Sequence, residues 1–203
     1  MNIIARAIIA LGRRGRAPDF IIGGIENPYL LRWWVIPRNR FFNIYLHQVV
    51  RDDDDRALHD HPWASCSIIL AGGYNEVLLH PAPKPGRRKG AQPCLVRRFR
   101  APGAILFRGA RALHRLELPR GQHDPAYARP CWTLFLTGPR LRHWGFACED
   151  GWVHWRDFTA ADDSARIGPG CAGRVTPPRW RTGFAGDPGR LPYPEHPAGE
   201  TRP

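Results

Sequence analysis

Two histidines separated by one residue, His59 and His61, have the types and spacing that metal chemistry requires. In an extended strand, residues i and i+2 point to the same side, so both imidazoles would face one way and Asp60 the other. Two neutral imidazole nitrogens on one side of a strand can bind a single metal ion. A lone pair of this kind is a weak indication, so a metal site needs further ligands from another part of the chain.

A third histidine follows in the segment 103–118, which reads as a turn at Gly103 and two short strands. His114 begins the second of these strands and shares one face with Leu116 and Leu118, whereas the charged residues between them face the other way. A histidine in line with a row of interior leucines can complete a three-histidine site. Such a site leaves positions on the ion open for substrate or oxygen.

The elements that must position these residues are short strands, which begin at about residue 29 and are separated by turns rich in Pro and Gly. Strands are expected within residues 29–36, 41–50, 65–80, 94–100, 104–109, 113–118, 131–138 and 151–158. Many short strands without a long helical period favour an all-β sandwich or a closed barrel.

Three regions follow from this pattern. They are an N-terminal helix and lead-in over 1–28, a β-barrel over 29–158, and a tail over 159–203. Residues 2–11 predict a short amphipathic helix. The tail is dense in Pro, Gly and Arg, and such a segment buries too little apolar surface to offset its ordering entropy, so irregular or disordered structure is expected there.

The formal charge is +12 and is carried almost wholly by arginine. A basic surface attracts nucleic acid, anionic lipid or an anionic substrate, but the chain carries no signature of a nucleic-acid-binding module, so nucleic acid is disfavoured as a partner. The apolar run at the N-terminus is too short for a membrane span, and its arginines follow the run, whereas a signal peptide places them first. These features predict a cytoplasmic protein that does not bind membranes.

The five cysteines lack C-x-x-C spacing. This disfavours both a disulfide framework and a structural zinc cluster, and free thiols in a reducing compartment are expected. The acidic run 52–55 lacks the spaced ligands of a calcium loop and is expected to form a solvated turn.

The histidine elements resemble, in order and spacing, the two half-motifs of the cupin superfamily of small β-barrels. The first half-motif, G-x5-H-x-H-x(3,4)-E-x6-G, is matched by His59, His61 and the glycine pair 72–73, and the second, G-x5-P-x-G-x2-H, by Gly103 and His114. The resemblance covers roughly residues 35–140. It implies an all-β, cupin-type double-stranded β-helix (a jelly-roll barrel), with a divalent metal held by the three histidines.

Gly109 and Arg111 stand where the second half-motif has its proline and second glycine, and the first half-motif lacks its leading glycine. The main departure from the cupin pattern is the missing glutamate, because Ser65 or Cys66 occupies its place. The spacing permits either residue to face the metal. A first shell of three histidines is similar to that of the thiol dioxygenases, a cupin branch with a three-histidine iron site. Their H-D-H-x4-C segment is matched by residues 59–61 and Cys66. That resemblance implies Cys66 as a candidate catalytic residue, although the expected strand 131–138 lacks the tyrosine to which this cysteine can be cross-linked.

Other side chains are candidates for parts of a small-molecule site. Tyr74 is expected in the core or the cavity wall, and Arg142 can form a charged clamp for a substrate carboxylate or phosphate. Three further arginines, Arg108, Arg111 and Arg140, are candidates for the same clamp, although each alone is expected at the surface. Glu76 is either a fourth ligand or, as we expect, a solvent-facing residue of the return strand. The tryptophan-rich segment 144–158 is expected to cover a barrel opening or form a dimer contact.

Together these features predict a metal-dependent cupin, in the form of a mononuclear non-haem iron oxygenase that acts on a small polar or anionic substrate. Fe(II) is the favoured ion, and Zn, Ni, Cu and Mn stay open because imidazole suits several metals. The alternative is a non-catalytic ligand-binding or regulatory cupin whose metal is structural or absent. A homodimer stays open as well.

Overall fold

Short antiparallel strands make up most of the structure, which is a computed structural model. It describes residues 2–53, 57–80, 94–120, 129–148, 151–159, 168–172 and 175–176. The helical segments are α1 (Ile3–Arg13), α2 (Trp155–Thr159) and the 3-10 turn η1 (Gly170–Ala172). The strands are β1 (Phe20–Ile22), β2 (Leu30–Trp34), β3 (Asn43–Val49), β4 (Leu58–His59), β5 (Ser65–Ala71), β6 (Tyr74–His80), β7 (Cys94–Arg100), β8 (Ile105–Arg108), β9 (His114–Glu117), β10 (Cys131–Thr137), β11 (Gly145–Ala147), β12 (Trp152–His154) and β13 (Val175–Thr176).

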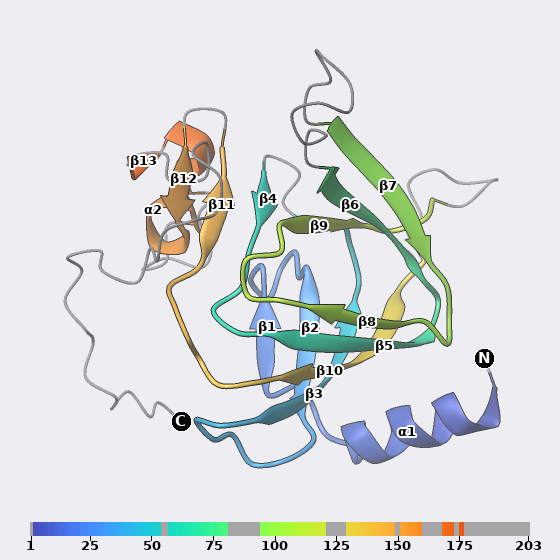
Figure 1. Cartoon of the computed structure of the whole chain (residues 1–203). Helices are drawn as coiled ribbons and strands as arrows, with labels where there is room; N and C mark the ends of the chain where they lie inside the picture. The colour runs from blue at the N-terminus through green and yellow to red at the C-terminus, as the bar shows by residue number, and fades with distance from the viewer. Residues whose placement is uncertain are drawn as a thin grey trace.

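The strands form two facing sheets (Figure 1). One sheet has the order β1-β2-β3-β10-β5-β8, and the other has the order β13-β12-β11-β4-β9-β6-β7. All of the pairings are antiparallel, and several join strands far apart in sequence, such as β3 with β10 and β4 with β9. Two such sheets with crossovers between them form a jelly-roll barrel. The predicted all-β fold class is therefore confirmed.

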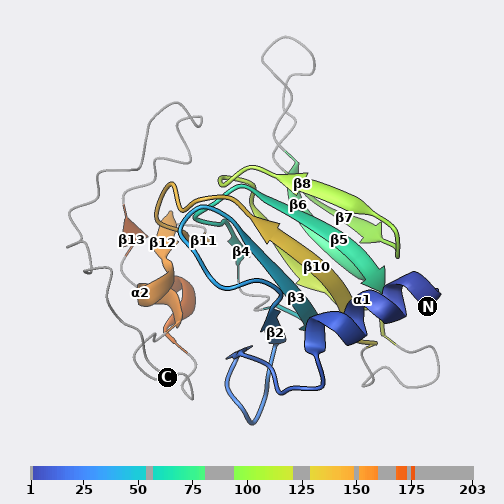
Figure 2. The same ribbon diagram turned by 90° about the horizontal axis from the view of Figure 1, so that it is seen from below.

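The central strand β10 shows how alternation divides the sheet into two faces. Cys131, Thr133, Phe135 and Thr137 are buried and face the barrel interior, whereas Trp132 and its neighbours on the same face pack outward. The outward face is covered by α1, which lies across the six-stranded sheet (Figure 2).

Helix α1 confirms the predicted N-terminal helix. The side-chain Oδ1 of Asn2 accepts a hydrogen bond from the Ala5 amide at 2.8 Å and caps the first turn. The helix buries Ala5, Ile9 and Gly12 against the sheet. A Cβ at Gly12 would lie 2.9 Å from the Leu46 side chain, so glycine permits this close approach. No helix of the described residues is long and apolar enough to cross a membrane.

Inward-facing residues change from apolar to polar along the barrel. One end is filled by an apolar cluster of Leu30, Val49, Ile69, Tyr74, Leu118 and Cys131. Two to four residues further along the same strands, the interior is lined by polar side chains, among them His47, Ser67 and Thr133. Buried polar groups are costly unless they are hydrogen-bonded. The polar end is therefore where a functional site is expected.

The chain passes from β5 in one sheet to β6 in the other through the glycine pair Gly72 and Gly73. Both residues have positive φ, 74° and 148°. A Cβ at Gly72 would also lie 2.3 Å from the Pro130 carbonyl oxygen. Only glycine meets both conditions, and the tight turn sets the register in which β6 enters the second sheet.

The segment 151–158 is not a single strand as predicted, because β12 ends at His154 and α2 follows directly. The helical turn stacks the Phe158 ring on Phe146 at 3.6 Å and the Trp155 ring on Trp144 at 5.7 Å. Burial of these rings outweighs the local strand pattern.

The expectation of five free thiols is wrong, since Cys148 and Cys171 form a disulfide with Cα atoms 5.5 Å apart. The short turn η1 packs against α2 and brings Cys171 beside the end of β11, a proximity that sequence spacing does not reveal. Strand β13 lies within the predicted tail and pairs with β12 of the predicted barrel region. Most of residues 159–203 lie outside the described part, so the predicted domain boundaries and the predicted cytoplasmic location stay predictions.

Candidate metal centre

The three predicted histidines converge at the polar end of the barrel. Strands β4 and β9 pair with His59 directly opposite His114. The centroid of the His59 ring lies 5.0 Å from that of His61 and 4.8 Å from that of His114. The ring centroids of His61 and His114 are 5.1 Å apart. The Nε2 atoms of His61 and His114 are 2.8 Å apart. One ring nitrogen from each histidine lies within 4.8 Å of the others.

Carboxylates stand behind two of the three rings. The Nδ1 atom of His59 lies 2.9 Å from Asp53 Oδ2, and Nδ1 of His114 lies 3.1 Å from Glu76 Oε1. A carboxylate in this position fixes the ring orientation and the tautomer, and leaves Nε2 available to a metal.

Burial keeps two of the imidazoles in the neutral form that binds metals. It lowers the pKa of His61 well below the usual range, and the positive charges of His59 and His114, when protonated, act in the same direction. The pKa of His114 is lowered to about 4 by burial, against the opposing hydrogen bond to Glu76. Burial would also lower the pKa of His59, but Asp53 outweighs burial and raises it.

The cluster fits a divalent metal ion. Imidazole nitrogens bind ions such as zinc at about 2.0–2.1 Å, which places ligands on one side of the ion about 3 Å apart. The 2.8 Å separation of the two Nε2 atoms is close to this spacing. The paired carboxylates behind His59 and His114 are the outer contacts that ligating histidines usually make.

Glu76 is buried, with 1% of its surface exposed, so the expectation of a solvent-facing residue is wrong. Strand β6 pairs with β9 so that Leu78 lies opposite His114, and alternation then turns Glu76 into the interior. Its Oε1 accepts from Arg108 Nε at 2.6 Å and its Oε2 from Arg100 Nε at 2.7 Å. Burial alone would raise the pKa of Glu76, but the hydrogen bond from His114 and the charge of Arg108 lower it to about 2. Glu76 is therefore an ionised support for His114.

Tyr74 belongs to the same buried network. Its hydroxyl accepts a hydrogen bond from Arg108 Nη2 at 3.3 Å, and Arg108 Nη1 donates to Ser67 Oγ at 3.1 Å. Burial raises the pKa of Tyr74, so the phenol stays protonated. The structure thus connects Tyr74 to His114 through Arg108 and Glu76 rather than directly.

Cys66 and Arg142 are not brought to the histidines. On β5 the inward residues include Ser65 and Ser67, so Cys66 faces outward, on the side where Ile68 packs toward α1. The side chain of Arg142 donates to Asp60 Oδ2 at 2.7 Å, on the opposite side of the His59–His61 segment. Neither placement supports the catalytic roles that the sequence predicts for these two residues.

Sequence reasoning missed three supporting residues. The sequence predicts Asp53 in a solvated turn, Glu76 in solvent and Arg108 at the surface. In the structure, Asp53 contacts His59, Glu76 contacts His114, and Arg108 donates to Glu76. One signal was available, since Tyr74 and Glu76 are two residues apart on a strand that leaves a glycine turn. An inward tyrosine there implies an inward glutamate.

No family model matches the chain. Solved structures that align with it include the DMSP lyase DddQ from Ruegeria pomeroyi DSS-3, at 19% identity over 63% of this chain and 52% of that one, with a TM-score of 0.35. Iron(II) HppE in complex with substrate aligns at 13% identity over 61% and 57%, with a TM-score of 0.41. A cupin superfamily protein from Desulfitobacterium hafniense DCB-2 aligns at 12% identity over 54% and 77%, with a TM-score of 0.34.

The chain thus spans about half the length of the DMSP lyase that it matches. Similarity at this level does not identify a reaction or a substrate. The chain's own strand order and its histidine spacing describe it more directly. It has an antiparallel jelly-roll fold, and the three histidines whose spacing resembles the cupin half-motifs are gathered in one cluster.

Proposed function

We propose that the chain binds one divalent metal ion through His59, His61 and His114 and is a metal-dependent enzyme, in its favoured form a mononuclear non-haem iron oxygenase. The observation that carries the proposal is the convergence of three imidazoles, two of them backed by carboxylates. An apolar core does not require such an arrangement. Burial of a carboxylate costs folding free energy, and buried ionisable groups are concentrated at functional sites.

When bound, a divalent ion supplies Lewis acidity and, in the case of iron, oxygen chemistry. The three histidines add no negative charge to the ion. Glu76 is already neutralised by Arg100 and Arg108. A positive charge at the centre therefore favours a small polar or anionic substrate whose donor atoms complete the coordination.

Aromatic rings limit the approach to the centre. The Phe146 and Trp144 rings lie 5.9 and 6.3 Å from His59, and the Phe135 ring lies 6.2 Å from His61. His114 is buried whereas His61 is partly exposed, so a substrate approaches from the His61 side. Walls of this kind exclude water and strengthen electrostatic contacts within the site.

The test compares His61→Ala with His143→Ala, which removes a histidine outside the cluster. Protein purified without added metal is measured by elemental analysis, and affinity is measured by competition with a chelator. We expect about one metal ion per wild-type chain and per His143→Ala chain, and loss of that ion from His61→Ala. Equal metal content in the two variants contradicts the site.

Catalysis is tested separately by oxygen uptake of iron-loaded protein with small thiols and carboxylates. Uptake that requires both iron and a substrate supports an oxygenase. Full metal occupancy without turnover supports the non-catalytic binding protein instead.

A further inference from the structure

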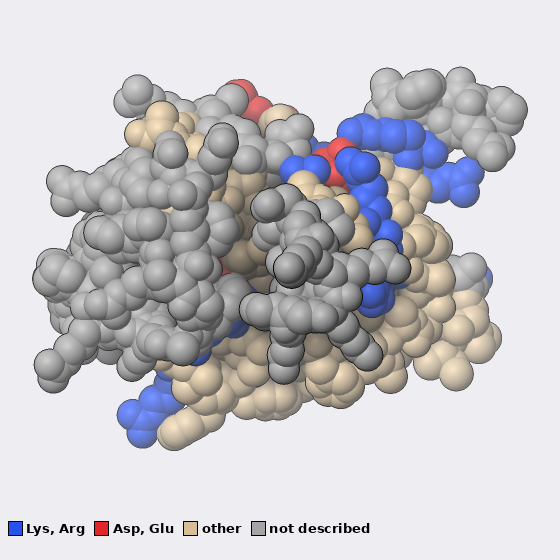
Figure 3. Space-filling view, turned by 45° about the horizontal axis from the view of Figure 1, so that its top comes forward, with Lys and Arg blue, Asp and Glu red and all other residues tan. Residues whose placement is uncertain are grey.

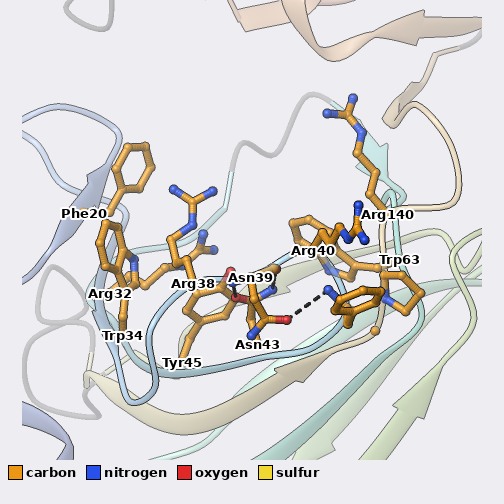
Figure 4. Close-up of a pocket in the computed structure, with 13 residues that line it drawn as sticks. Phe20, Arg32, Trp34, Arg38, Asn39, Arg40, Asn43, Tyr45, Trp63 and Arg140 are labelled. Atoms are coloured by element: carbon orange, nitrogen blue, oxygen red, sulfur yellow. Dashed lines mark hydrogen bonds between the residues drawn. The ribbon is translucent and has the colours of Figure 1, made fainter. Parts of the chain in front are cut away.

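A cavity of about 580 Å³ opens in the six-stranded sheet, where it is lined by residues of β2 and β3 and of the segment that follows β10. Four arginines and no acidic residue line it. The arginines are Arg32, Arg38, Arg40 and Arg140. Figure 4 shows the guanidinium groups of Arg38 and Arg140 on opposite sides of the cavity, with Tyr45 and Asn43 between them at its base.

The four arginines of this cavity have no acidic partner in the described part of the chain. Among the residues that the structure describes, no carboxylate lies within ion-pair distance of the four guanidinium groups. Arg32 is half-buried, donates from Nε to His47 Nε2 at 2.8 Å, and lies over the Tyr45 ring at 4.7 Å. Burial lowers its pKa to about 10, so the group is still a cation at neutral pH.

Some of the arginines elsewhere on the described surface are neutralised by carboxylates. Figure 3 shows basic side chains gathered over the β7 side of the barrel, with acidic side chains among them. In that region Arg97 and Arg115 both donate to Glu117. Four like charges around one concave surface, in contrast, produce a positive potential that attracts an anion. The cavity therefore combines a concave shape with four arginines that have no ion-pair partner among the described residues.

The cavity walls present flat apolar surfaces next to these charges. Trp34, Tyr45 and Trp63 line it, and the guanidinium of Arg38 lies over the Trp34 ring at 5.3 Å. Cation–π contacts hold the guanidinium groups of Arg32 and Arg38 in place. The partly exposed rings of Trp34 and Trp63 can stack on a planar ligand.

The loop that carries Arg38 and Arg40 is ordered before any ligand binds. The side-chain Oδ1 of Asn39 accepts hydrogen bonds from the Phe41 and Phe42 amides at 3.0 and 2.9 Å, and Asn43 Oδ1 accepts from the Asn39 amide at 3.0 Å. A loop fixed in this way loses little further entropy when a ligand is bound.

We propose that this cavity binds a small planar organic anion, whose carboxylate or phosphate is held by the arginines while its ring lies against the aromatic walls. Between the cavity and the metal ligands lies a layer of rings. Tyr45 stacks on His47 at 5.8 Å, His47 stacks on Phe135 at 5.0 Å, and Phe135 lies 6.2 Å from His61. Binding in the cavity therefore does not require a metal ion, and this inference stands apart from the proposed function.

The test is calorimetric titration of metal-free protein with phenyl phosphate, benzoate, inorganic phosphate and the neutral benzyl alcohol. Arg38→Gln and Arg140→Gln each remove one charge from the cavity, and Arg6→Gln removes an exposed charge from α1 as the matched control. We expect phenyl phosphate or benzoate to bind the wild type. Each cavity variant should weaken that binding roughly tenfold, since a charge-assisted hydrogen bond contributes about that much. Arg6→Gln should bind as the wild type does, and added salt should weaken binding.

The relative affinities of phenyl phosphate and benzoate identify the anionic group. Binding of benzyl alcohol as tight as that of the anions overturns the role of charge. Binding of inorganic phosphate as tight as that of phenyl phosphate overturns the role of the aromatic walls. An equal loss in Arg6→Gln and in the cavity variants shows attraction to the overall positive charge only, and overturns the site.

Discussion

Glu76→Gln changes the charge at the centre of the buried network while keeping the size of the side chain. The carboxylate accepts hydrogen bonds from Arg108 Nε at 2.6 Å and from Arg100 Nε at 2.7 Å, and it lies 3.1 Å from His114 Nδ1. The Arg108 side chain is 7% exposed. With a neutral amide in place of Glu76, the guanidinium of Arg108 is left buried without its counter-charge.

Removal of one partner from a buried ion pair costs roughly 3–5 kcal/mol of folding free energy. The Arg100 side chain is 21% exposed and can reach water, so we expect the lower end of that range, about 3 kcal/mol. Glu76 also orients His114, and loss of such an outer contact typically lowers metal affinity roughly 10–100-fold. The variant should therefore lose both stability and metal affinity.

The matched control is Glu117→Gln, because Glu117 also accepts hydrogen bonds from two arginines but on the barrel surface. Its partners Arg97 and Arg115 are 67% and 16% exposed, and Glu117 itself is 21% exposed, so water screens these ion pairs more than the Glu76 network. The loss of stability should therefore be smaller than that of Glu76→Gln. Urea denaturation of metal-free protein measures the stability difference, provided that the dependence of stability on urea is unchanged. Chelator competition measures metal affinity. Equal destabilisation by the two substitutions, together with unchanged metal affinity in Glu76→Gln, refutes the role assigned to this network.

Two further predictions concern pH and the disulfide. Burial lowers the pKa of His114 and of His154 to about 4, so both are neutral in the folded protein at pH 5, whereas the unfolded chain binds protons below about pH 6.5. Stability of the metal-free protein should therefore fall between about pH 6.5 and 4, as measured by urea denaturation, and equal stability at pH 7.5 and 5 contradicts the assignment. For the disulfide, an unreduced digest analysed by mass spectrometry should contain the peptides of Cys148 and Cys171 joined together, and separate peptides contradict the pairing. Reduction should cost about 2–4 kcal/mol of stability in the same denaturation assay.

The sequence could predict the histidine cluster because strand alternation and motif spacing are local properties. His59 and His61 share a face in any extended strand, and His114 heads a strand whose leucines mark the interior. The two cupin half-motifs then place these strands side by side, as the pairing of His59 with His114 confirms.

The supporting residues could not be predicted in this way because each depends on long-range pairing. Asp53 lies beside His59 in a position fixed by β9, since the Asp53 amide donates to the Leu116 carbonyl oxygen at 2.9 Å. Arg108 lies on β8 in the six-stranded sheet, whereas its partner Glu76 lies on β6 in the other. The register that joins them is set by the turn at residues 72–73, and no local pattern specifies it. The disulfide is a contact of the same kind.

Asp60, which lies between His59 and His61, shows how both faces of one short segment are used. Asp60 points away from the imidazoles, as alternation predicts, and accepts hydrogen bonds from Arg142 Nη1 at 2.7 Å and from the Gly145 amide at 2.9 Å. Gly145 begins β11, and a Cβ there would lie 2.2 Å from the Val153 carbonyl oxygen, so only glycine lets β11 and β12 lie so close.

Strand β11 in turn pairs with β4, with Phe146 opposite His59. Thus Asp60 fixes the histidine segment from its opposite face, while the Phe146 ring lies beside His59 on the same face as the imidazoles. Asp53 and Glu76 hold two of the imidazole rings. Because Arg142 donates to Asp60, it stabilises the position of the ligands. The unpaired arginines of the cavity are left as the groups best placed to recognise an anion.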